Sequence, residues 1–93
     1  MPDVMTDKFM LKYGRSGNCG DDVAEALAMA VTDGTSGRFN EMKYRQVADD
    51  NMVAIDKWGH LNNGQRRMLL GNVLRGKIRR GGTVKINGGV FQE

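Results

Sequence analysis

Apolar residues recur three or four positions apart in three stretches of the chain, over residues 22–33, 40–50 and 63–80. This spacing gathers the apolar side chains on one face of a helix, so it predicts three amphipathic helices. We expect these faces to form the core. The expected core residues are Val23, Leu27, Ala30 and Val31, then Tyr44, Val47 and Ala48, then Leu69, Leu70, Val73, Leu74 and Ile78.

Polar residues that favour helix starts precede each of these stretches. Asp22 predicts the N-cap of the first helix, because Glu25 then occupies the third helical position, as in a capping box. Asn40 predicts the N-cap of the second helix, and Asn62 or Asn63 predicts that of the third.

The C-terminal ends of the second and third helices carry signals as well. Asn51 follows the second helix, and we expect it to adopt the left-handed backbone conformation that asparagine tolerates. Gly81 and Gly82 follow the third helix, and glycine is the residue that most often ends a helix in this way.

Two further segments predict strands. Apolar and polar residues alternate in part over 8–13, which favours a short strand. The segment 83–91 has Asn87 and Gly88 at its centre, which is the signal for a hairpin with a type I′ turn. The sequence therefore predicts an α+β fold, mainly α, in a single domain over 1–93.

The charges are unevenly distributed, although the formal net charge is only +3. Residues 1–56 hold six bases and ten acids, whereas residues 57–93 hold eight bases and one acid, Glu93. Because no acid lies between residues 57 and 92, nothing in that segment repels a polyanion. The basic C-terminal third therefore indicates a negatively charged partner.

The predicted third helix places a polar stripe opposite its apolar face, made of Gln65, Met68, Asn72, Arg75 and Arg79. In a major groove, arginine can bind guanine, and asparagine and glutamine can bind adenine, whereas arginine and lysine also suit phosphates. We therefore predict a nucleic-acid-binding surface on this helix and the hairpin. Its predicted residues are Gln65, Arg66, Arg67, Asn72, Arg75, Lys77, Arg79, Arg80 and Lys85.

The order of the second and third helices resembles a loose helix-turn-helix arrangement, in which a later helix enters the major groove. The connection between Asn51 and Asn63 is longer than the usual turn of that arrangement. Gly71 and Gly76 lie within the predicted third helix, where glycine costs stability. We expect a phosphate strand or a neighbouring helix to approach the helix backbone closely at these glycines. The sequence does not decide between the two.

These features favour a small non-enzymatic protein that binds nucleic acid, with double-stranded DNA favoured over RNA, in a regulatory or architectural role. The alternative is a protein-interaction module, or a small inhibitor or adaptor, that docks its basic face on an acidic protein partner. A single-strand binder needs aromatic side chains on that face, whereas most of the six aromatic residues fit core positions. The sequence is also compatible with a homodimer.

Other classes of site have little support in the sequence. One histidine, His60, and one cysteine, Cys19, cannot supply the ligands of a usual zinc site, so we expect no metal, no cofactor and no enzyme. No apolar run reaches the length of a membrane span, so we expect a cytoplasmic protein without membrane contact. Most of Met10, Met29, Met42 and Met52 are expected to fill the core, whereas Met68 is expected on the exposed stripe.

Overall fold

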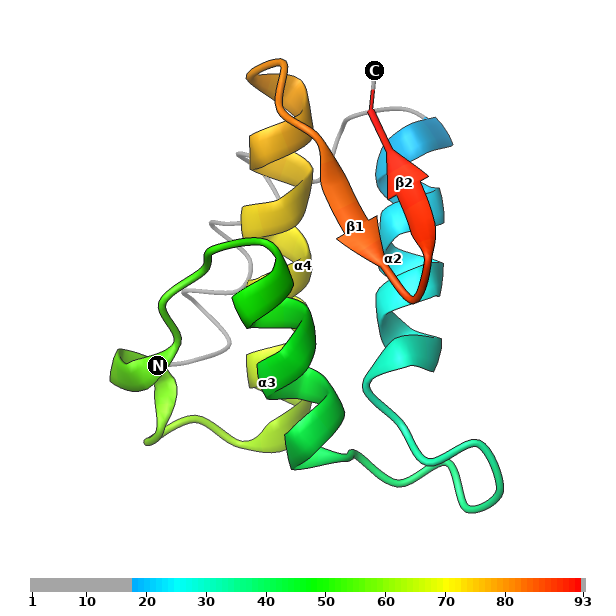
Figure 1. The fold of residues 1–93 in the computed structure, drawn as a ribbon. Helices are drawn as coiled ribbons and strands as arrows, with labels where there is room; N and C mark the ends of the chain where they lie inside the picture. The colour runs from blue at the N-terminus through cyan, green and yellow to red at the C-terminus, as the bar shows by residue number, and fades with distance from the viewer. Residues whose placement is uncertain (1–17, 93) are drawn as a thin grey trace.

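The computed structural model describes residues 18–92, as helices with a C-terminal hairpin laid across them (Figure 1). The fold class is α+β and mainly α, as the sequence predicts. The predicted strand over 8–13 lies outside the described residues. In chain order the elements are α2 (Asn18–Ala30), α3 (Glu41–Asp50), the 3-10 turn η1 (Asp56–Trp58), α4 (Asn63–Arg79), β1 (Val84–Ile86) and β2 (Gly89–Phe91).

The longest described helix is α4; α2 packs along it, and β1 contacts all three helices. The predicted apolar faces of the helices are buried, with the exception of Val73, which is half-buried. Two residues of β1 complete this core. The core residues are Val23, Leu27, Ala30, Val31, Tyr44, Val47, Ala48, Leu70, Leu74, Ile78, Val84 and Ile86.

The close approach of α2 to α4 occurs at Gly71. An ideal Cβ atom at Gly71 would lie 3.4 Å from Cδ2 of Leu27 on α2. The sequence allows either a phosphate strand or a neighbouring helix close to this glycine, and the structure shows a neighbouring helix. A β-carbon at this position would already be in van der Waals contact with Leu27, so glycine here leaves the backbone of α4 open to α2.

The ends of α2 differ from the sequence prediction. The helix already includes Asn18, the first described residue, so Asp22 lies inside it, exposed, and the prediction of Asp22 as N-cap is wrong. Packing of the apolar face of α2 on α4 outweighs the weak helix propensity of the residues before Asp22. The helix ends at Ala30, short of its predicted end, because Thr32 pairs with Phe39 in an isolated antiparallel bridge.

The capping predictions for the other two helices are confirmed. The Oδ1 atom of Asn40 accepts a hydrogen bond from the Lys43 amide at 3.1 Å, at the start of α3. Asn62 and Gln65 form a capping box at the start of α4, in which each side chain accepts from the other residue's amide, at 2.9 and 3.0 Å. These bonds satisfy amides that have no partner within the helix.

The two glycines after α4 end it as predicted. The Gly82 amide donates to the Lys77 carbonyl at 2.8 Å and the Gly81 amide to the Ile78 carbonyl at 2.9 Å, the bond pattern of a Schellman motif. Gly81 has a φ of 87°, which favours glycine. This turn directs the chain back over the helices as β1.

The hairpin has the predicted turn. Asn87 and Gly88 connect the strands with φ angles of 50° and 83°, which confirms the type I′ conformation. Ile86 lies opposite Gly89 where the antiparallel pair begins. Within β1 the residues on both sides of Lys85 are buried and Lys85 is exposed, so one face of the strand covers the helices.

Asn51 does not adopt the expected left-handed conformation, since its φ is −112°. Its side chain is only 3% exposed and joins α3 to the hairpin. Its Nδ2 donates to the carbonyls of Val47 at 2.9 Å and Lys85 at 2.8 Å, and its Oδ1 accepts from the Lys85 amide at 2.8 Å. Lys85 is opposite Val90 in a pair whose main-chain groups point away from each other. The side-chain amide of Asn51 therefore bonds the main-chain groups at the outer edge of β1, as a third strand would.

The left-handed residue is Met52 instead, with a φ of 57°. The hydrogen bonds of its side chain hold Asn51 in place. The chain therefore reverses its direction at the next residue, Met52. A left-handed conformation costs a residue other than glycine about 1–2 kcal/mol. The Met52 side chain is 86% exposed, and Met29 and Met42 are exposed as well, so the expectation that these methionines fill the core is wrong. Met68 is exposed as expected.

Replacing Asn51 with alanine should lower the free energy of unfolding by about 2–3 kcal/mol, because the main-chain groups of Lys85 then lose their partners. Urea denaturation measures this loss. Asn63→Ala is the matched control, since Asn63 is exposed in the first turn of α4, and it should change stability by less than about 0.5 kcal/mol. Equal losses in both variants would contradict the role of Asn51.

Candidate binding surfaces

The polar stripe predicted on α4 is not exposed along its length. Asn72 is 0% and Arg75 is 8% exposed, so the expectation that they lie on the surface is wrong. The helical wheel assumes that one face of α4 is covered, whereas the observed helix has neighbours on more than one side. Met68 and Arg79, nearer the ends of the stripe, are exposed. Side chains buried in this way cannot reach base edges in a groove.

Arg75 and Asn72 bind each other inside the molecule. The Nη1 atom of Arg75 donates to Oδ1 of Asn72 at 3.0 Å. A buried guanidinium has lost its hydration and needs such polar contacts in exchange. The Nδ2 atom of Asn72 is buried and has no hydrogen-bond partner in the described part of the chain. The observed contacts of this pair are therefore internal.

Residues 51–62 between α3 and α4 are here called the linker. Arg66 of α4 binds both the linker and α3. Its Nη1 donates to Oε1 of Glu41 at 2.9 Å, in an ion pair with α3. Its Nη2 and Nε donate to the carbonyls of Gly59 and Trp58, at 2.9 and 3.3 Å. Each of its three nitrogen atoms donates one of these bonds and the side chain is only 18% exposed, so Arg66 holds the linker and presents little of its guanidinium to a phosphate.

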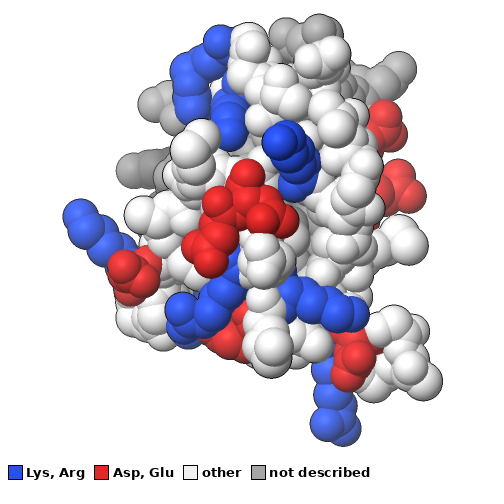
Figure 2. All heavy atoms as spheres, viewed as in Figure 1, with Lys and Arg blue, Asp and Glu red and all other residues white. Residues whose placement is uncertain are grey.

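Four of the predicted cations are exposed and form no ion pair within residues 18–92, namely Arg67, Arg79, Arg80 and Lys85. They do not gather at one place: Arg67 and Arg79 are separated by about 18 Å along the axis of α4, at 1.5 Å per residue. On the face seen in Figure 2, Lys and Arg side chains are interspersed with Asp and Glu. These four cations are therefore spread over the length of α4, its C-cap and β1 rather than gathered at one point.

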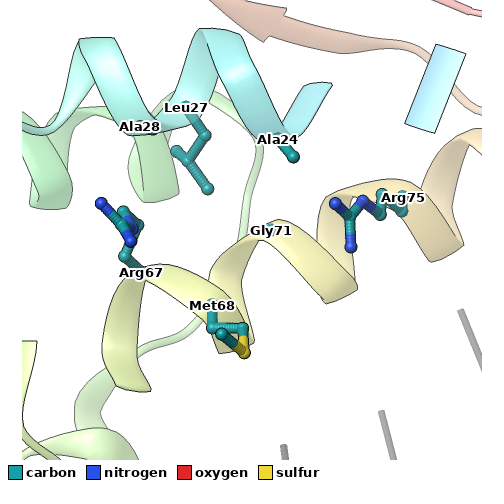
Figure 3. Close-up of a pocket in the computed structure, with 7 residues that line it drawn as sticks. All are labelled: Ala24, Leu27, Ala28, Arg67, Met68, Gly71 and Arg75. Carbon is teal, nitrogen blue, oxygen red and sulfur yellow. The ribbon is translucent and has the colours of Figure 1, made fainter. Parts of the chain in front are cut away.

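A hollow of about 160 Å³ lies between α2 and α4. Figure 3 shows Arg67 and Arg75 at its two ends, one helical turn on either side of Gly71, with Leu27 pointing from α2 toward α4 between them. Its α2 side is formed by small side chains, Ala24 and Ala28. Since Arg75 is already hydrogen-bonded to Asn72, the hollow presents one exposed cation, Arg67.

A larger groove of about 500 Å³, here called the linker groove, runs between the linker and the C-terminal half of α4. Most of the described residues that line it are apolar, and the two charged ones among them are both basic. The sequence pattern alone does not mark this groove, because an apolar run after α3 also fits a chain that re-enters the core. The lining residues are Asn51, Met52, Val53, Ala54, Trp58, Val73, Lys77 and Arg80.

A small polar hollow of about 90 Å³ lies beside Tyr44, between α3 and the linker, and Glu41 and Arg66 are part of its lining. The Tyr44 side chain is buried, and its hydroxyl has no hydrogen-bond partner in residues 18–92. Burial raises the pKa of Tyr44, while the charge of Arg66 acts in the opposite direction. The phenol is therefore neutral in ordinary buffers.

Within residues 18–92, no three His, Cys, Asp or Glu side chains are grouped so that they could hold a metal ion. No described helix is both long and apolar enough to cross a membrane. Comparison with known proteins finds no family model that matches the chain, and no similar curated protein or solved structure. Inferences about function therefore rest on the surfaces described above.

Arg75→Ala should lower the free energy of unfolding by about 2 kcal/mol, because it removes a buried side chain and leaves the Asn72 carbonyl oxygen without its donor. Arg79→Ala removes the same charge from the surface and should change stability by less than about 0.5 kcal/mol. Thermal and urea denaturation of the two variants measure the difference. A small effect of Arg75→Ala, similar to that of Arg79→Ala, would show that Arg75 is a surface residue.

Proposed function

We propose that the chain is a small non-enzymatic protein that binds nucleic acid, with double-stranded DNA preferred, through phosphates rather than base edges. The main support is that Arg67, Arg79, Arg80 and Lys85 are exposed and have no carboxylate partner within residues 18–92. Cations without a carboxylate partner retain their full attraction for a polyanion. The absence of any acid between residues 57 and 92 adds to this attraction.

The proposed mode of binding differs from the base readout that the sequence suggests. The polar side chains suited to base edges have internal partners, namely Gln65, Arg66, Asn72 and Arg75. Arg79 and Arg80 at the end of α4, and Lys85 on β1, suit phosphates instead. Phosphate contacts position a protein on a duplex but carry no direct sequence information. We therefore expect little sequence preference, as in an architectural role.

Fluorescence anisotropy with a short labelled duplex of mixed sequence tests this proposal. If four phosphates are neutralised, the logarithm of the association constant should fall against the logarithm of salt concentration with a slope of about −4. The double variant Arg79→Ala/Arg80→Ala should reduce this slope by about two, and it should weaken binding to all sequences alike.

The control is Arg38→Ala/Lys43→Ala, which removes two exposed cations before and within α3 and lowers the net charge equally. It should leave the salt slope close to that of the unmodified chain. Equal effects of the two double variants would show that net charge alone drives the association. No binding at about 100 μM protein in low salt would reject the proposal.

A further inference from the structure

The linker groove contains an apolar side chain that the fold does not need. Met52 is held in the left-handed conformation and its side chain is 86% exposed. Glycine or asparagine would suit this backbone better, and burial of the side chain contributes almost nothing to the core. Methionine, tryptophan and arginine are enriched at protein interfaces, and all three occur in the lining of this groove. Met52 therefore fits a contact with a partner.

The charges of the groove indicate the chemistry of that partner. Among residues 18–92, the charged residues that line the groove are Lys77 and Arg80, and no Asp or Glu of this range is part of the lining. The Nζ atom of Lys77 donates to the Asn51 carbonyl at 3.3 Å, which holds the ammonium group at the groove. Arg80 is exposed beside it and forms no ion pair within residues 18–92. An apolar surface with two neighbouring cations is complementary to an apolar segment that carries carboxylates.

We propose that the linker groove binds a short segment of a partner protein in which bulky apolar residues adjoin Asp or Glu. The apolar side chains would pack on Met52, Trp58 and Val73, and a carboxylate would pair with Lys77 and Arg80. This interaction goes beyond the proposed binding of nucleic acid. It depends on a different set of side chains, although Arg80 is common to both surfaces.

Two other occupants fit the groove less well. Single-stranded nucleic acid binds through successive aromatic side chains on which its bases stack, and the lining holds one aromatic residue, Trp58, among aliphatic ones. A second copy of the chain would match the apolar lining, but the pair of cations requires carboxylates beside an apolar surface. Both occupants are outcomes that the following experiment detects.

A library of short random peptides displayed on phage, selected on the immobilised chain, identifies the preferred segment. We expect enrichment of peptides in which Asp or Glu adjoins Leu, Met or Phe. A selected peptide without tryptophan should shift the emission of Trp58, the single tryptophan of the chain. Enrichment of peptides without acids, or binding that leaves the emission of Trp58 unchanged, would overturn the proposal.

Two variants locate the contact. Met52→Gly removes the side chain and suits the backbone, so it should weaken peptide binding at least about fivefold without lowering Tm. Arg80→Glu should weaken binding about tenfold, and a peptide with Lys in place of its acids should recover it. The matched controls Met42→Ala and Arg38→Glu, which alter exposed residues outside the groove, should bind as the unmodified chain does.

Unchanged peptide affinity in Met52→Gly would overturn the proposal. So would single-stranded DNA that displaces the peptide and alters Trp58 emission more strongly. Analytical ultracentrifugation would reveal a dimer that Met52→Gly dissociates, which would assign the groove to a second copy. Met52→Gly should leave duplex binding intact, and Arg79→Ala should leave peptide binding intact, so failure of one proposal is distinguishable from failure of the other.

Discussion

The pairing of the Asn51 side chain with the main chain of Lys85 fixes how the helices and the hairpin lie together. It joins the end of α3 to a strand 34 residues further along the chain, and the Asn51 carbonyl also accepts from Lys77 on α4. One buried asparagine thus connects three elements of the fold. Its side-chain amide donates and accepts as a peptide group does, so the outer edge of β1 is paired without a third strand.

This contact also shapes the surface around it. Because the Asn51 side chain holds the end of α3, the chain reverses at Met52, and the side chain of Met52 points into solvent at the linker groove. Lys77 and Arg80 reach the same groove from α4. The strain at Met52 and the position of the groove follow from the same hydrogen bonds, so the shape of the linker groove and the stability of the hairpin are physically coupled.

Features set by neighbouring residues could be predicted from the sequence. The caps at Asn40 and Asn62, the turn at Asn87 and Gly88, and the apolar faces of the helices depend on side chains a few positions apart. Asn51 shows the limit of such reasoning. An asparagine after a helix usually indicates an exposed turn, and its burial depends on Lys85, which no local pattern connects to it.

The candidate site was harder to predict for the same reason. A helical wheel orders the residues of α4 around its axis, but it does not show how many neighbours cover the helix. The wheel places Asn72 and Arg75 on the polar side of α4, but packing against this helix buries both residues. Arg79 and Arg80 at the end of α4, beyond most of that packing, are exposed as expected.

Amide hydrogen exchange of the hairpin tests the role of Asn51 most directly. Lys85 and Val90 are opposite each other, and both amides point away from the strand pair. The Lys85 amide is bound to Asn51, whereas the Val90 amide faces the outer edge of β2. We predict that the Lys85 amide exchanges about a hundredfold more slowly than that of Val90. Equal, fast exchange at both positions would contradict the pairing on which the arrangement of the molecule depends.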